Sequence, residues 1–156
     1  MNSCELVHTE NIARLLKPVW YNEGVIAYDA FTLRSKLHEA YISVLREALP
    51  TFHQDAMNIV RGRKNSVYAS INVGELSERE DVTENNVVSY SVKEVDNAQL
   101  PSHAGIYIAI NGHNIVGGEP FGTFLRQKGV ADEAILVEIG YKLAMMAQKN
   151  IKVLSI

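Results

Sequence analysis

The residues able to carry out acid–base, nucleophilic or metal chemistry are few and widely scattered along the sequence. The histidines stand at positions 8, 38, 53, 103 and 113. They show no metal-ligand spacing with cysteine or with one another, and the acidic residues form no EF-hand pattern. Ser102 precedes His103 directly, but adjacency in sequence is not the relation between members of a catalytic triad. We therefore expect no catalytic residue, cofactor or metal, and the sequence favours a protein that is not an enzyme.

One short stretch, "GIYIAINGHNIVGG" at residues 105–118, has a pattern that invites a chemical interpretation. Its centre, Asn111-Gly112, lies between apolar runs and is the strongest short-range signal for a β-hairpin, since both residues tolerate the positive φ of a type I′ turn. That turn places Ile110 opposite His113 and Ile108 opposite Ile115. The isoleucines of the first strand then point together into the core.

The same stretch resembles the signature of the GIY-YIG nucleases. Those enzymes carry two tyrosines on a hairpin, an arginine on the next helix and a glutamate that holds a metal. The resemblance rests on the run from Gly105 to Tyr107, on Gly117 and on Arg126, and it implies DNA cleavage. The sequence departs from the family at Ile115, where the second tyrosine is expected.

Residues 106–118 also resemble the second and third strands of GNAT acyltransferases, and residues 139–156 are similar to their later helix and strand. This resemblance implies transfer of an acyl group from acetyl-CoA. The family's Gly-rich pyrophosphate loop does not precede the last helix, where Gly140 is a lone glycine. A helix N-terminus alone can still bind phosphate.

Three apolar patterns upstream predict helices. Residues 9–17 form a short segment that Thr9 can cap and Pro18 can end. Apolar residues at spacings of three and four predict a longer helix over 30–48. Pro50 separates it from a third helix, in which Thr51 and Gln54 form a capping box and Gly62 fits the left-handed stop.

The middle and end of the chain have different periods. Alternating apolar residues predict strands at 66–74 and 86–95, ahead of the hairpin. A long helix is expected at 131–150 and a final strand at 151–156. We therefore expect an α+β fold with N-terminal helices, an antiparallel β-meander of about four strands, a long C-terminal helix and a final short strand.

The long helix carries two apolar stripes. The first contains Ile135, Ile139, Leu143 and Met146, and the second contains Val137, Tyr141 and Met145. A helix that is apolar on two sides is buried between layers or shared with another subunit. The second stripe is therefore a candidate interface, and Gly140 between the stripes permits a close approach of another backbone.

Charged segments supply further interface candidates. The segment 75–84 is expected to form an extended loop whose acidic residues are Glu75, Glu78, Glu80, Asp81 and Glu84. It is either a solvated loop or a docking arm for a basic surface. The basic run at 61–64, with Arg61, Arg63 and Lys64, offers such a surface on a neighbouring copy.

Bulk composition limits the function classes. The chain has 156 residues, of which 47% are hydrophobic and 21% charged, which fits one globular domain, 1–156. A net charge of −3 argues against general nucleic-acid binding. With no apolar run long enough for a bilayer, no secretory signal and the single Cys4, we expect no membrane contact and a cytoplasmic location.

These observations favour a non-enzymatic interaction or assembly protein that binds copies of itself or another protein. The order of elements is similar to that of ring-forming subunits of phage tails and necks, which implies a virion component assembled in the cytoplasm. It is also similar to compact inhibitor and immunity proteins. Both likenesses concern the fold alone. The small acyltransferase and the nuclease remain the alternatives.

Overall fold

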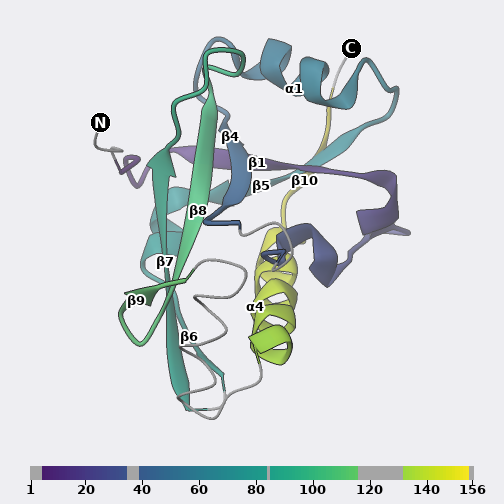
Figure 1. The fold of residues 1–156 in the computed structure, drawn as a ribbon. Coiled ribbons are helices and arrows are strands. Elements are labelled where there is room, and N and C mark those ends of the chain that lie inside the picture. The colour runs from purple at the N-terminus through teal and green to yellow at the C-terminus, as the bar shows by residue number, and fades with distance from the viewer. Residues whose placement is uncertain (1–4, 35–38, 84, 116–131, 155–156) are drawn as a thin grey trace.

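A curled antiparallel β-sheet, shaped like half of a barrel, dominates the fold (Figure 1). The structure, a computed structural model, describes residues 5–34, 39–83, 85–115 and 132–154. Seven strands follow the order β10-β5-β1-β4-β8-β7-β6, and β9 pairs with β8 as the eighth. Their bounds are β1 Asn11–Leu16, β4 Ile42–Arg46, β5 Val67–Asn72, β6 Glu80–Thr83, β7 Asn86–Glu94, β8 His103–Ile110, β9 His113–Asn114 and β10 Ile151–Val153.

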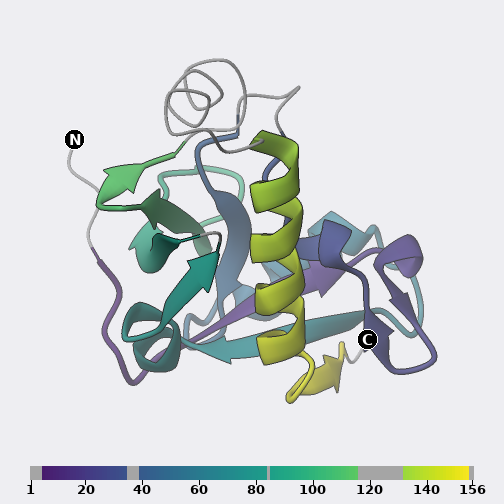
Figure 2. The same ribbon diagram turned by 90° about the horizontal axis from the view of Figure 1, so that it is seen from below.

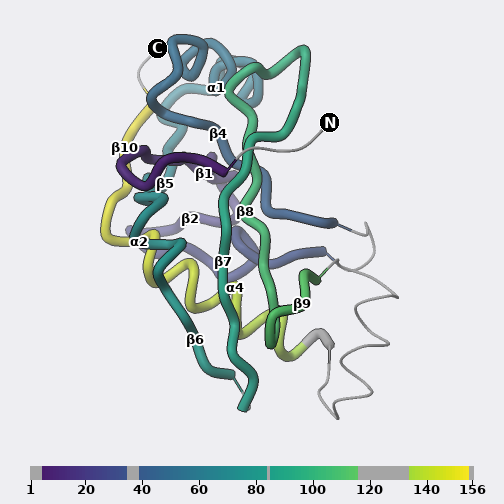
Figure 3. The backbone as a smooth tube through the Cα atoms, turned by 90° about the vertical axis from the view of Figure 1, so that its left-hand side faces the viewer, coloured from purple at the N-terminus to yellow at the C-terminus, as the bar shows by residue number. Residues whose placement is uncertain are grey.

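Helices lie on both sides of this sheet. The α-helices are α1 Phe52–Val60, α2 Val73–Ser77 and α4 Asp132–Ala147. Two short 3-10 helices, η1 Pro18–Trp20 and η2 Tyr28–Phe31, flank a separate pair of strands, β2 Tyr21–Asn22 and β3 Val25–Ile26. Figure 2 shows α4 crossing one face of the sheet. In the view of Figure 3, α1 lies at the opposite end of the molecule from β6.

The expected fold class is wrong, because the sheet dominates and the chain does not begin with helices. Residues 9–17 contain β1, an inner strand between β4 and β5. Residues 30–48 contain the end of η2 and all of β4, which pairs with β1 and β8. The sheet has eight strands, more than the meander of about four and the final strand that were expected.

Tertiary pairing explains why β1 and β4 are strands. All six residues of β1 pair with β5, which follows some fifty positions later in the chain. Ile42 and Val44 of β4 are β-branched residues that suit a pleated surface, and both are buried. The spacing of three and four residues seen over 30–48 is therefore not a helical stripe, and long-range hydrogen bonds outweigh weak local propensity.

Of the predictions for α1 and the hairpin, all but the capping box are confirmed. A helix follows Pro50, and it ends at Arg61 and Gly62, which both have positive φ. The capping box does not form, because the side chain of Thr51 makes no capping hydrogen bond. At the hairpin turn Asn111 and Gly112 have φ values of 52° and 82°, and Ile110 pairs with His113 as predicted.

The main core lies between α4 and the sheet face beneath it. Ile106, Ile108 and Ile110 of β8 are at most 1% exposed and belong to this core, as the hairpin register predicts. From α4 the first predicted stripe, with Ile139 and Leu143 at its middle, packs onto them. A smaller cluster on the other face packs the apolar side of α1 against Ala13 and Leu45.

Asp55 of α1 fastens that helix to the start of β8. Its carboxylate is 3% exposed and accepts hydrogen bonds from the backbone N–H and the hydroxyl of Ser102, at 2.9 and 2.6 Å. Ser102 therefore hydrogen-bonds to Asp55 and not to His103. The bonds join two elements that are 47 residues apart in the sequence.

Candidate functional site

The second stripe of α4 is exposed, in contrast to the first. Tyr141 is 57% exposed and Met145 is 65% exposed, while Val137 is half-buried. These side chains lie on the side of α4 that faces away from the core. The sequence groups them as a second stripe, and their role in an interface stays a prediction.

Residues from the N-terminal third extend this exposed face. The ring of Tyr28 stacks on that of Tyr141, with centroids 6.1 Å apart and planes inclined by 13°. Val25, which is 57% exposed, lies nearby on β3. We call the set of Val25, Tyr28, Tyr141 and Met145 the α4 surface. Beside it is an open hollow of about 580 Å³, to which Ala144 and Lys149 also contribute.

The predicted acidic loop is not an extended loop. Asn72 caps α2 by accepting a hydrogen bond from the backbone N–H of Glu75 at 2.9 Å, and Val73 and Leu76 of this helix are buried. The next segment is β6, which pairs with β7. Hydrophobic burial and strand pairing therefore fold a segment whose charges alone predict extension.

Only part of the acidic cluster stays exposed. Glu75, Glu78 and Glu80 face solvent, whereas Glu84 lies outside the described residues. Asp81 is half-buried and accepts hydrogen bonds from Arg79, at 3.1 and 3.0 Å, and from the hydroxyl of Tyr90 at 2.6 Å. It therefore holds β6 to β7. Docking of the other three stays a prediction.

The basic run follows α1 on the surface. Arg61, Arg63 and Lys64 are all exposed, and Arg61 has the left-handed conformation that ends the helix. The structure does not bring the run together with the acidic segment through any recorded ion pair of the described residues. Arg63 instead contributes to a groove that the sequence did not predict.

This groove opens where β1 and β4 diverge. The two strands pair only at Ile12 with Arg46 and at Ala13 with Leu45. Beyond these positions β1 follows β5, and a space of about 620 Å³ opens between β1, β4, η1 and α1. We call it the β1–β4 groove.

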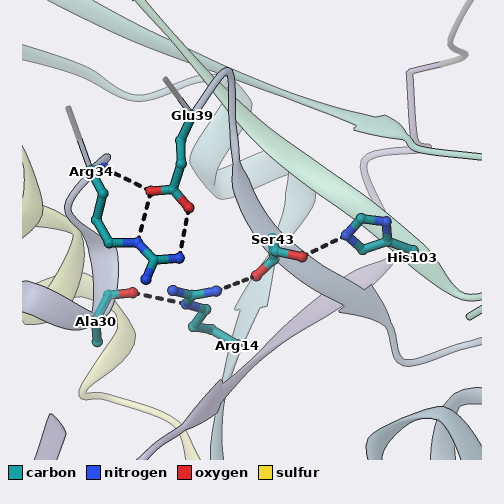
Figure 4. A network of polar contacts seen from close by, with 6 residues as sticks. All are labelled: Arg14, Ala30, Arg34, Glu39, Ser43 and His103. Atoms are coloured by element: carbon teal, nitrogen blue, oxygen red, sulfur yellow. Dashed lines mark hydrogen bonds and ion pairs between the residues drawn. The ribbon is translucent and has the colours of Figure 1, made fainter. Parts of the chain in front are cut away.

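The half-buried side chain of Arg14 binds backbone carbonyls at the place where β1 and β4 do not pair. Nε of Arg14 donates to the carbonyl of Ala30 at 2.8 Å, and Nη1 donates to the carbonyl of Ser43 at 2.7 Å (Figure 4). Burial lowers the pKa of Arg14 to about 10, while Glu39 opposes this shift and Arg34 adds to it. Arg14 therefore remains charged at neutral pH.

Glu39 and Arg34 form an ion pair beside Arg14. Oε1 of Glu39 accepts from the backbone N–H of Arg34 at 2.7 Å, and its Oε2 accepts from Nη2 at 3.0 Å. The hydrogen bond to Glu39 raises the pKa of Arg34. Trp20 completes this side of the groove, with the charged groups of Arg14 and Lys17 each 4.8 Å from its ring centroid.

Ser43 and His103 form a polar pair on neighbouring strands. Oγ of Ser43 lies 2.5 Å from Nε2 of His103, and the ring of Tyr41 meets the imidazole edge-on at 5.8 Å. Nδ1 of His103 is buried and has no hydrogen-bond partner among the described residues. A catalytic serine requires an acid that orients the histidine. Within the described part of the chain, the pair therefore has the serine–histidine contact of a triad but lacks the contact between histidine and acid.

Acid should destabilise the protein through His103. Burial lowers the pKa of this imidazole below the ordinary value of 6.5. Below that pH the unfolded chain binds the proton more readily than the folded protein does, so the free energy of unfolding falls as pH falls toward the folded-state pKa. Urea denaturation at pH 7.5 and 5.5 measures the loss. His103→Gln should lose less stability over this interval than the parent, and an equal loss would contradict the assignment.

The structure also locates the residues of the two family resemblances. Tyr107 of the nuclease-like motif is half-buried, lies against Tyr41 at 5.3 Å and has the ammonium of Lys93 over its ring. Ile115 is buried, and Gly117 and Arg126 lie outside the described residues. The second tyrosine beside Tyr107 thus comes from the segment before β4 and not from the hairpin.

The groove could not be predicted from the sequence, because several of its residues lie in segments whose apolar spacing suggests helices. Arg14 falls in the helix expected over 9–17, and Arg34 and Glu39 fall in the one expected over 30–48. One signal was present: in "NIARLL", Arg14 shares its period-two face with Ile12 and Leu16. A charge at an inward position of a strand pattern is unusual and marks a special role.

Comparison of the chain with protein families, with characterised proteins and with solved structures finds no match. Among the described residues, no group of three or more histidine, cysteine, aspartate or glutamate side chains is arranged to hold a metal ion. No helix in the described part of the chain is long and apolar enough to cross a membrane.

Proposed function

We propose that the protein is a non-enzymatic assembly protein, and that it pairs with a second copy of itself through the α4 surface. The observation that supports this proposal is the exposure of Tyr141 and Met145, at 57% and 65%, on a helix whose other side forms the core. Large apolar side chains that cluster on a surface are typical of protein interfaces. Tyrosine and methionine are also enriched in such interfaces.

The shape of the surface suits a second copy. Tyr141 and Met145 stand one helical turn apart, beside the hollow between α4 and β3. In a twofold interface the same patch meets itself, so a projection and an adjacent recess on one patch complement each other. A twofold axis between Tyr141 and Met145 would place each tyrosine on the partner's methionine. Contacts between sulfur and an aromatic ring are favourable.

Charges at the two ends of the surface favour an antiparallel arrangement. Glu138 and Lys149 are both exposed, and they flank the stripe at opposite ends. Glu138 lies within α4, and Lys149 follows its last residue, Ala147. In the antiparallel pair described above, Glu138 of each copy lies opposite Lys149 of the other. This arrangement specifies register, because a parallel pair would bring like charges together.

The double change Tyr141→Glu and Met145→Glu should weaken self-association by about 100-fold or more, since central apolar anchors contribute most of the binding free energy. Light scattering coupled to size-exclusion chromatography measures the mass across a concentration series. A matched control, Val7→Glu with Val87→Glu, adds the same charge at exposed positions away from α4. A parent protein that is monomeric at every concentration refutes the proposal.

A charge exchange tests the register independently. Glu138→Lys alone places lysine opposite Lys149 and should weaken pairing, as Lys149→Glu alone should. The combined variant restores opposite charges and should recover the parent's association. If the combined variant is as weak as the sum of the single variants, the antiparallel register is wrong, although pairing through Tyr141 could still stand on the first experiment.

A further inference from the structure

We infer that the β1–β4 groove binds a small molecule that carries a phosphate group. Its lining residues include four cations, Arg14, Lys17, Arg34 and Arg63, and a single anion, Glu39. The groove therefore has a net charge of +3 in a chain whose net charge is −3. Basic residues gathered against the overall sign of a protein focus an attractive field on anions.

The arginines are arranged for an oxyanion. Two of the three nitrogens of Arg14 are fixed by the carbonyls of Ala30 and Ser43, and its Nη2 has no acceptor among the described residues. Figure 4 shows this guanidinium beside the ion pair of Arg34 and Glu39. A guanidinium already held in place loses little side-chain entropy when it binds. The positions of Arg14 and Arg34 suit a group with several acceptor oxygens.

Electrostatics inside the groove favour an added anion. Burial lowers the pKa of Arg14 more than the nearby carboxylate of Glu39 raises it, and the repulsion from Arg34 is the smallest of the three effects. A dianionic phosphate would compensate the desolvated charge of Arg14 and bring the groove close to neutrality. Hydrogen bonds between charged groups are about twice as strong as neutral ones, so phosphate fits better than a neutral polar group.

The remaining walls of the groove define the rest of the ligand. Apolar side chains contribute from three elements: Leu45 from β4, Ile59 from α1 and Trp20 from η1. The volume of about 620 Å³ lies within the range of ordinary small-molecule sites. We therefore expect an organic phosphate with a small apolar body, rather than inorganic phosphate, to fill the site.

Trp20 is the single tryptophan of the chain, and its fluorescence reports on the groove directly. Iodide, an anion, should quench Trp20 much more strongly than caesium, a cation, at equal ionic strength. Phenyl phosphate should change the fluorescence saturably. Inorganic phosphate should bind more weakly, and phenol should not bind measurably. Equal quenching by iodide and caesium, or equal binding of phenol and phenyl phosphate, overturns the inference.

Two variants with the same charge change locate the site. Lys17→Gln with Arg63→Gln removes two exposed cations of the groove and should weaken phenyl phosphate binding about tenfold or more, because charge-assisted hydrogen bonds to phosphate are lost. Arg61→Gln with Lys64→Gln removes two exposed cations outside the groove lining and should change binding by less than about threefold. An equal loss in both variants shows a nonspecific field and overturns the site. Self-association plays no part in these measurements.

Discussion

Replacing Gly140 with alanine should destabilise the protein by about 2–3 kcal/mol, since a methyl group added to a fully packed contact forces its neighbours apart. In an exposed helix the same change stabilises by about 1 kcal/mol. Here a Cβ would collide with Oγ1 of Thr32 and would lie 2.8 Å from the backbone carbonyl of Tyr28. The close backbone approach that the sequence suggested for this glycine is confirmed, and its partner is the segment at η2.

A second substitution separates the contribution of Thr32 to this strain from that of the Tyr28 carbonyl. Thr32→Ala removes the hydroxyl but leaves the carbonyl of Tyr28 in place. The double variant should therefore recover part of the loss in urea denaturation, and the two changes should be non-additive. A Gly140→Ala protein as stable as the parent would show that α4 does not pack on η2 as described. Because Tyr28 belongs to the α4 surface and Ala30 binds Arg14, such a shift would disturb both candidate sites.

Local signals predicted the elements that depend on local interactions. The hairpin at Asn111 and Gly112 requires only a turn that tolerates positive φ and apolar residues in phase on either side. The first stripe of α4 and the stop after α1 are of the same kind. For each of these, the residues that determine the conformation lie within a few positions of one another.

Long-range pairing decided the elements that the sequence analysis assigned wrongly. The run "NIARLL" can be drawn as a helical turn or as a strand, and β5 on one side and β4 on the other select the strand. The acidic segment was misjudged for a related reason. Its charges predict a solvated loop, but Leu76 is fully buried and Asp81 is engaged by Arg79 and Tyr90.

The two candidate sites differ in how far a sequence can predict them. Tyr141 and Met145 share a helical face, so their grouping follows from the period of a single element. The β1–β4 groove combines residues from β1, η1, β4 and α1, and its opening depends on where β1 parts from β4. No pattern within one segment records that divergence, so the cations of the groove looked like ordinary surface charges.

Replacing Arg46 with methionine should cost about 3–5 kcal/mol, the range found when one partner of a buried ion pair is removed. The side chain of Glu10 is 4% exposed, and its carboxylate accepts hydrogen bonds from Nε and Nη2 of Arg46 at 2.6 and 3.1 Å. Glu94 lies 3.4 Å from Nη1 but is 46% exposed, so water can replace the arginine there. Without Arg46 the carboxylate of Glu10 stays buried with no cation to compensate its charge.

The stability of three variants distinguishes this account from a simple loss of packing. Arg46→Lys should be intermediate, since an ammonium keeps the charge but cannot form both hydrogen bonds of the fork. Glu10→Gln with Arg46→Met should be more stable than Arg46→Met alone, because the buried charge is gone as well. Chemical denaturation at pH 7 gives the three free energies of unfolding. If the double variant is the least stable, the loss arises from packing around Arg46, and the buried charge of Glu10 is not its cause.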